Sequence, residues 1–170
     1  MVDARVTDGY RIAELLASEI DGRRSGPLGR LAVANPDRTV SGSPAGERAY
    51  DVLFLEDERD PRREPTPDAA GPILARAFVH EEGASVAVYA GVAAAERTAR
   101  DAGLQAGPAA GPGEGPAFDP ASGPESDPVA ASPASDATTG YTVLTVEYGA
   151  QVKRVADALS AASAAYKSAD

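Results

Sequence analysis

Hydrophobic and polar residues alternate with two different periods along this chain. An apolar, β-branched run from Tyr141 to Glu147 is typical of a strand. After Gly149 the apolar residues recur at intervals of three and four, which predicts an amphipathic helix; they are Val152, Val155, Ala156, Leu159 and Ala162. Neither element can bury its apolar face alone, so we expect a sheet built from the middle of the chain to receive the strand.

Two more helices are predicted before this unit. Thr7 or Asp8 can cap the first, and we expect Gly22 to end it in the left-handed conformation; its apolar stripe consists of Ile12, Leu15, Leu16 and Ile20. The second helix runs from Val92 to Ala102 and is followed by Gly103.

Four strands are predicted between and around these helices: Leu31 to Val33, Ala49 to Leu55, Ile73 to His80 and Ala84 to Ala90. The last two are separated by Glu81, Glu82 and Gly83, which indicates a bulged hairpin. Strict alternation gives the sheet a mostly aliphatic face and a mixed face. Ile73, Ala75, Ala77 and Val79 are assigned to one face, and Leu74, Arg76, Phe78 and His80 to the other; on the preceding strand Tyr50, Val52 and Phe54 point one way and Asp51, Leu53 and Leu55 the other.

A tract rich in Pro, Gly and Ala separates the last strand from the rest. Residues 105–138 contain seven prolines, five glycines, five acids and no base, so we expect them to be a disordered linker. The predicted fold class is α+β: a mostly antiparallel sheet of four to five strands, with two or three helices on one face. Residues 1–104 form the first part of a single domain, and residues 139–166 complete it.

Composition indicates the cellular compartment of the chain. The chain has 26 acids against 16 bases, a net charge of −10 and no cysteine, which points to a reducing cytoplasm. The N-terminus lacks a basic segment followed by an apolar run, so we expect no signal peptide. The longest uncharged apolar run, Ala84 to Ala95, is too short to cross a membrane.

Three segments resemble a family of small uncharacterised proteins of halophilic archaea. They are Asp8 to Glu19 with Gly26 to Leu28, the hairpin around Phe78 to His80, and Gly149 to Leu159. The resemblance implies a salt-rich cytoplasm. It implies no activity and no functional residue, because the family has no established function.

Most residues that could form a catalytic or metal site have a simpler interpretation. His80, next to Glu81 and Glu82, is interpreted as an exposed turn residue, since a metal site needs ligands from several elements. The carboxylates from Glu56 to Asp60 could hold Mg²⁺, but nearby arginines favour a solvated loop. The sequence contains no G-x-S-x-G nucleophile elbow and no dinucleotide fingerprint. We therefore predict no catalytic residue, metal or cofactor.

One anion site is a candidate. Gly149 and Ala150 lead into a helix that carries Lys153 and Arg154, and N–H groups at a helix start attract anions. Nucleic acid is not expected, because the chain as a whole is acidic.

Two functions stay open. The leading hypothesis is a non-catalytic protein-interaction or self-association module, with a second copy or another protein as the partner. The alternative is a small-molecule or anion-binding protein, or a weak enzyme, that uses the Gly149 turn and the mixed face around Tyr50, Phe78 and Tyr89.

The net charge yields one prediction about stability. At about 1 M salt the Debye length falls to roughly 3 Å, so repulsion between the acidic side chains is screened. We expect a higher melting temperature in concentrated KCl than in dilute buffer. Equal melting temperatures in the two would contradict salt adaptation.

Overall fold

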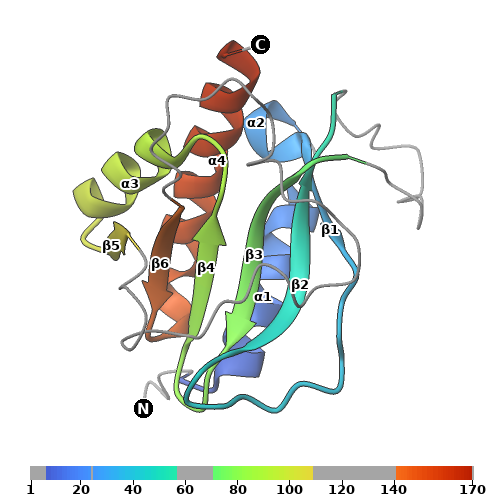
Figure 1. Cartoon of the computed structure of the whole chain (residues 1–170), viewed down its shortest axis with the longest axis vertical. Coiled ribbons are helices and arrows are strands. Elements are labelled where there is room, and N and C mark those ends of the chain that lie inside the picture. The colour runs from blue at the N-terminus through green and yellow to red at the C-terminus, as the bar shows by residue number, and fades with distance from the viewer. Residues whose placement is uncertain (1–6, 24, 57–70, 109–140, 170) are drawn as a thin grey trace.

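The computed structural model of the chain describes residues 7–23, 25–56, 71–108 and 141–169 (Figure 1). These residues form six strands, four α-helices and a 3₁₀ turn: α1 (Gly9–Gly22), α2 (Gly26–Gly29), β1 (Leu31–Ala34), β2 (Glu47–Phe54), β3 (Ile73–Val79), β4 (Ala84–Val88), α3 (Val92–Asp101), β5 (Gln105–Pro108), β6 (Thr142–Val146), η2 (Gly149–Gln151) and α4 (Val152–Ser168). The strands form one sheet in the order β1-β2-β3-β4-β6-β5, and every neighbouring pair is antiparallel.

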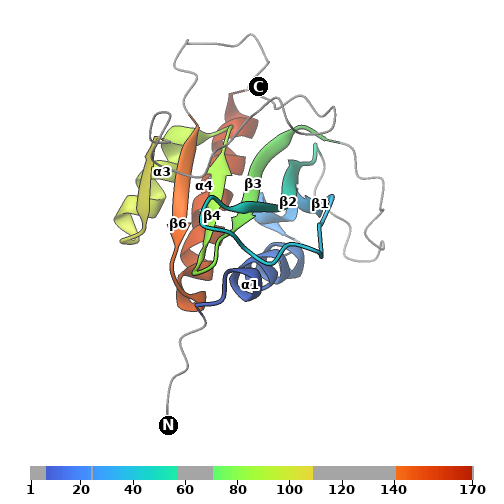
Figure 2. The same cartoon turned by 60° about the horizontal axis from the view of Figure 1, so that its bottom comes forward.

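The helices lie on one face of this sheet, as Figures 1 and 2 show from two sides. The buried stripe of α1 and the buried face of α4 meet the aliphatic residues of the central strands in one core. Its largest fully buried side chains include Ile12, Leu16, Leu144 and Leu159. Burial of each such side chain stabilises the fold by about 1.5–3 kcal/mol relative to leaving it exposed. The predicted α+β class, with an antiparallel sheet, is confirmed.

Helix α4 contacts each of the other three α-helices. Small residues allow the closest of these contacts: Ala95 and Ala99 of α3 and Ala162 of α4 are fully buried. Gly91, at the start of α3, has a φ of +63°, and a Cβ there would lie 2.2 Å from the carbonyl oxygen of Ala162. Only glycine permits both this backbone conformation and this approach.

Strand β6 returns to the place where the chain left the sheet. It pairs with β4 on one side and with β5 on the other, with Pro108 opposite Thr142. The Thr142 hydroxyl donates to the carbonyl oxygen of Gly107 at 3.1 Å. The described residues on either side of 109–140 therefore lie at neighbouring positions on adjacent strands.

The numbers of strands and helices differ from the prediction. Six strands replace the expected four to five, and four α-helices replace two or three. The extra strand is β5, at the start of the tract predicted to be disordered, where pairing with β6 overrides local composition. The rest of that tract, from residue 109 on, lies outside the described residues. The extra helix is α2, which has Pro27 in its first turn and a buried Leu28.

The expected helix ends are correct at one end of α1 and wrong at the other. Asp8 is the N-cap, and its carboxylate accepts the N–H of Arg11 at 2.8 Å. Gly22 is the last helical residue but has no positive φ, so it does not close the helix in the left-handed conformation. Among the described helices, none is long and apolar enough to cross a membrane.

The meeting of β5 and β6 predicts that residues 109–140 are dispensable for folding. Replacing these 32 residues by a Gly-containing turn of about four residues should preserve the circular dichroism spectrum. Loop-closure entropy then raises the free energy of unfolding by about 2 kcal/mol, measurable by urea titration. A Gly/Ser segment of the original length is the control and should leave stability near that of the parent. Loss of the fold in the shortened chain would show that the segment contributes to the core.

Candidate functional site

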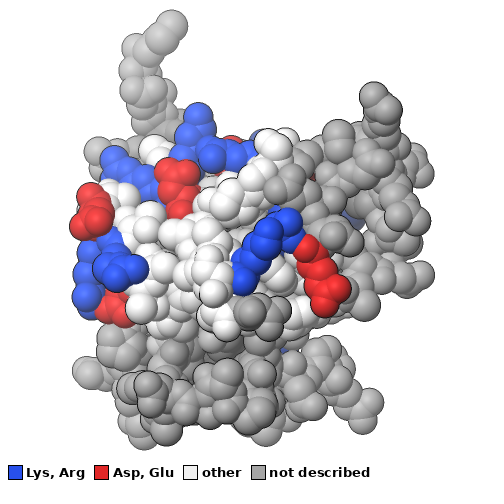
Figure 3. Space-filling model, turned by 90° about the horizontal axis from the view of Figure 1, so that it is seen from above, with Lys and Arg blue, Asp and Glu red and all other residues white. Residues whose placement is uncertain are grey.

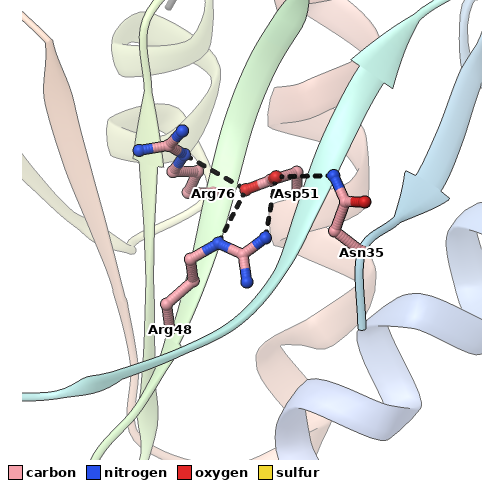
Figure 4. A network of polar contacts seen from close by, with 4 residues as sticks. All are labelled: Asn35, Arg48, Asp51 and Arg76. Atoms are coloured by element: carbon pink, nitrogen blue, oxygen red, sulfur yellow. Dashed lines mark hydrogen bonds and ion pairs between the residues drawn. The ribbon is translucent and has the colours of Figure 1, made fainter. Parts of the chain in front are cut away.

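The face of the sheet opposite the helices carries a buried polar cluster centred on Asp51 (Figure 4). Arg48 donates to both carboxylate oxygens, from Nε to Oδ1 at 3.1 Å and from Nη2 to Oδ2 at 2.9 Å. Arg76 Nε donates to Oδ1 at 3.1 Å, and Asn35 Nδ2 donates to Oδ2 at 3.1 Å. Asp51 is 2% exposed and Arg76 is 5% exposed.

A β-bulge creates this cluster. Arg48 and Asp51 are three residues apart, so a regular strand would place them on opposite faces. The register of β2 against β3 shifts between Arg48 and Tyr50, and Ala49 joins Tyr50 in the core. The extra residue reverses the alternation and brings Arg48 to the same face as Asp51.

A second shift changes the assignment of β3. The register moves between Val52 and Leu53, which face Ala75 and Ile73. Leu74 is therefore an extra residue and packs in the core, whereas Ile73 is buried outside the core cluster. The predicted faces of these two residues are wrong, because strict alternation cannot anticipate a bulge.

The four donors fill the acceptor capacity of the Asp51 carboxylate, which has about four lone-pair sites. The cluster therefore ties together the end of β1, β2 and β3, and it is not suited to act as a general base.

The aromatic residues named for the mixed face do not form one site. Tyr50 faces the helices, is 4% exposed and donates its hydroxyl to the carbonyl oxygen of Ala13 at 2.9 Å. Burial raises the pKa of Tyr50 well above its ordinary value. Phe78 pairs with Ser85 on the opposite face, and the Tyr89 ring packs on Tyr141 with 5.7 Å between centroids. Tyr50 is thus separated from Phe78 and Tyr89 by the sheet.

His80 is not an exposed turn residue, and this prediction is wrong. Its half-buried ring lies against Gly46, where a Cβ would approach Cε1 to 2.7 Å. Nε2 is 2.8 Å from Ser85 Oγ, and Nδ1 is 3.4 Å from the carbonyl oxygen of Pro44. Nδ1 faces a backbone carbonyl where a catalytic triad has a carboxylate, and Ser85 is only 4% exposed. The contact between His80 and Pro44 connects the loop before β2 to the β3–β4 turn.

The residues predicted for the anion site lie around η2 and the first turn of α4. Ala150, Lys153 and Arg154 are exposed, and Gly149 is half-buried. The N–H of Gln151 donates to the carbonyl oxygen of Tyr148 at 3.0 Å, and the N–H of Val152 donates to that of Gly149. These intrachain bonds use two of the N–H groups that an anion would need.

The carboxylates weighed as Mg²⁺ ligands, for which a solvated loop is the favoured interpretation, lie mostly outside the described residues. Glu56 is exposed, and Asp57, Glu58 and Asp60 lie outside the described residues. In the part of the chain that is described, no three His, Asp or Glu side chains are grouped closely enough to hold a metal ion.

A groove of about 500 Å³ lies between α1 and the end of β1. Its apolar wall and floor include Tyr10, Leu15, Ala17, Val33 and Tyr50. Two acids and two bases line its rim: Arg11, Glu14, Asp37 and Arg38. Leu15 is 37% exposed and is the only large hydrophobic side chain classed as exposed among the described residues.

Hydrogen bonds and an ion pair hold several side chains of the groove. Asp37 accepts the hydroxyl of Thr39 at 2.6 Å and its N–H at 2.9 Å, and these bonds lower the pKa of Asp37. Arg11 pairs with Glu14 at 2.9 Å, whereas Arg38 forms no ion pair with another described residue. The Tyr50 hydroxyl is held by α1, as described above.

Comparison with known proteins identifies a family of unknown function. A family model matches residues 1–117, which cover the groove, the Asp51 cluster and the strands from β1 to β5. The chain belongs to the family of unknown function DUF7993. No curated protein matches the chain, and no solved structure matches it.

The DUF7993 match ends before β6 and α4, although both elements pack in the core. Gly149 to Leu159, on which part of the sequence resemblance rested, lies outside the matched residues. The description of DUF7993 names no activity and no source organism.

The Asp51 cluster gives a stability prediction. In Asp51→Asn, a neutral amide faces two buried or half-buried guanidinium groups, so we expect a loss of about 3–5 kcal/mol in the free energy of unfolding. The matched control is Glu14→Gln, which removes the exposed pair with Arg11 and should cost less than about 1 kcal/mol. Urea unfolding measures both. Equal costs in the two variants would contradict a structural role for Asp51.

Proposed function

We propose that this chain is a non-catalytic protein-interaction module, and that the groove between α1 and β1 is its contact surface. The observation that carries the proposal is the exposed Leu15 beside an apolar groove at the edge of the sheet. An edge strand next to a helix is a recurring site for an added extended segment, which receives backbone hydrogen bonds from the strand and pockets from the groove.

The polar clusters support this choice over catalysis. The Asp51 carboxylate is saturated by four donors, and the His80 ring contacts Ser85 in its own hairpin and the carbonyl oxygen of Pro44 in the loop before β2. Both sets of contacts stabilise the fold. The groove, in contrast, has an apolar floor and a charged rim, which is the anatomy of a protein contact.

The second candidate is an anion-binding protein that uses Gly149, Ala150, Lys153 and Arg154. The exposure of Lys153 and Arg154 in the first turn of α4 favours it. Against it stand the two N–H groups already bonded within η2.

We also propose a salt-rich cytoplasm as the setting, supported by the net charge of −10. The described residues carry 14 acids and 11 bases, a balance of −3, so most of the excess negative charge lies elsewhere in the sequence. Figure 3 shows both signs side by side around uncharged surface at the upper end of the molecule. Salt therefore acts on a folded surface of nearly balanced charge.

A photo-crosslinking residue at Leu15 tests the contact surface. The full chain should form a covalent adduct with a polypeptide, either a second copy or another protein, and the same reagent at exposed Ala93 on α3 should not.

Ala17→Arg, which fills the groove, should weaken binding of that polypeptide about ten-fold, a loss of about 1.4 kcal/mol in binding free energy. Ala93→Arg is the control for an added positive charge on a helix away from the groove. Equal binding by the two arginine variants would contradict the proposal.

A further inference from the structure

Both carboxylates on the rim of the groove between α1 and β1 already have donors within the chain. Glu14 accepts from Arg11 Nη1 at 2.9 Å. Asp37 accepts the hydroxyl of Thr39 at 2.6 Å and its N–H at 2.9 Å. A ligand in the groove therefore meets acceptors that are in use.

The donors of the groove are not in use. The exposed side chain of Arg38 makes neither a hydrogen bond nor an ion pair with another described residue. Tyr10 and Ser18 also line the groove, and neither hydroxyl has a hydrogen-bond partner within the described part of the chain. A guanidinium offers five N–H donors and no acceptor, and it binds a carboxylate through two parallel charge-assisted bonds. The groove therefore favours a ligand that brings a carboxylate to Arg38.

The apolar surface of the groove sets a second requirement. Leu15 is 37% exposed and Val33 is half-buried, and both line the groove. An apolar side chain packed against them would remove this surface from water. The lining residues of α1 extend from Tyr10 to Ser18, a rise of about 12 Å, which about four residues of extended chain would span. A groove of this length suits a segment of polypeptide.

We propose that the groove binds a segment of another protein in which an aspartate or glutamate lies beside a large apolar residue. This inference rests on the proposed function and names the chemistry of the partner. The carboxylate of the segment pairs with Arg38, and the apolar side chain packs on Leu15 and Val33. The charge of the ligand is thus complementary to the one rim charge that has no partner among the described residues.

An array of immobilised, acetylated hexapeptides tests this choice. Each peptide carries a leucine at one central position of a Gly/Ser sequence, and the adjacent position takes each other residue type in turn. The full chain should bind the aspartate and glutamate peptides about five-fold more strongly than the glutamine peptide, the upper range for an ion pair at a surface.

Variants of Arg38 assign the preference to this residue. Arg38→Gln should remove the preference for acidic peptides, Arg38→Lys should retain part of it, and Arg38→Glu should turn it toward lysine and arginine peptides. Arg97→Glu is the matched control, because Arg97 is an exposed arginine of α3 without a partner among the described residues. It changes the net charge equally and should leave the preference intact. Urea unfolding checks that each variant is folded, which we expect because Arg38 is exposed.

Several outcomes would overturn the inference. They are equal binding of the acidic and glutamine peptides, no binding of any peptide, and a preference for acid that persists in Arg38→Gln. Octanoate that binds as tightly as the best peptide would make the ligand a small apolar acid instead. A dimer in sedimentation that Ala17→Arg abolishes would make it a second copy. If a photo-crosslinker at Leu15 still captures a polypeptide after such a failure, the proposed interaction function stands with a different partner; if it captures none, both fail.

Discussion

The fold depends on a strand and a helix that arrive last in the sequence. Strand β6 fills the position between β4 and β5, and α4 packs across the other three α-helices. Without β6 and α4, the apolar side chains of α1, α3 and β4 that now pack against them would be exposed to solvent. The burial of Leu144, Val155 and Leu159 is the interaction that joins the two ends of the chain in one core.

The opposite face of the sheet carries a different constraint. A buried aspartate requires donors for both oxygens, and the bulge at Ala49 supplies Arg48 to the same face. The same bulge turns Ala49 and Tyr50 toward α1, where they line the groove. One irregularity in β2 thus shapes both the polar cluster and the floor of the candidate contact surface.

The sequence predicted helices and strands well where residue propensity and hydrophobic period alone determine them. The cap at Asp8, the strand before Gly149 and the helix after it follow from propensity and period. The prediction failed where contacts with distant strands determine the structure. Strand β5 forms because its backbone can pair with β6, and Leu74 packs in the core because of a bulge. The i to i+3 spacing of Arg48 and Asp51 gives no sign of a contact in a regular strand, so the Asp51 cluster was missed. Exposure of Leu15 was missed for a related reason: its place in the apolar stripe of α1 indicates burial.

The central claim is that β6 and α4 fold as part of the same cooperative unit as β2 and β3. Native-state hydrogen exchange across a denaturant series measures the opening free energy of each amide. The account predicts that the slowest amides of β6 and α4 open with the same free energy, and the same denaturant dependence, as those of β2 and β3. A distinctly lower opening free energy for β6 and α4 would show that they form a separable unit, and would contradict the account.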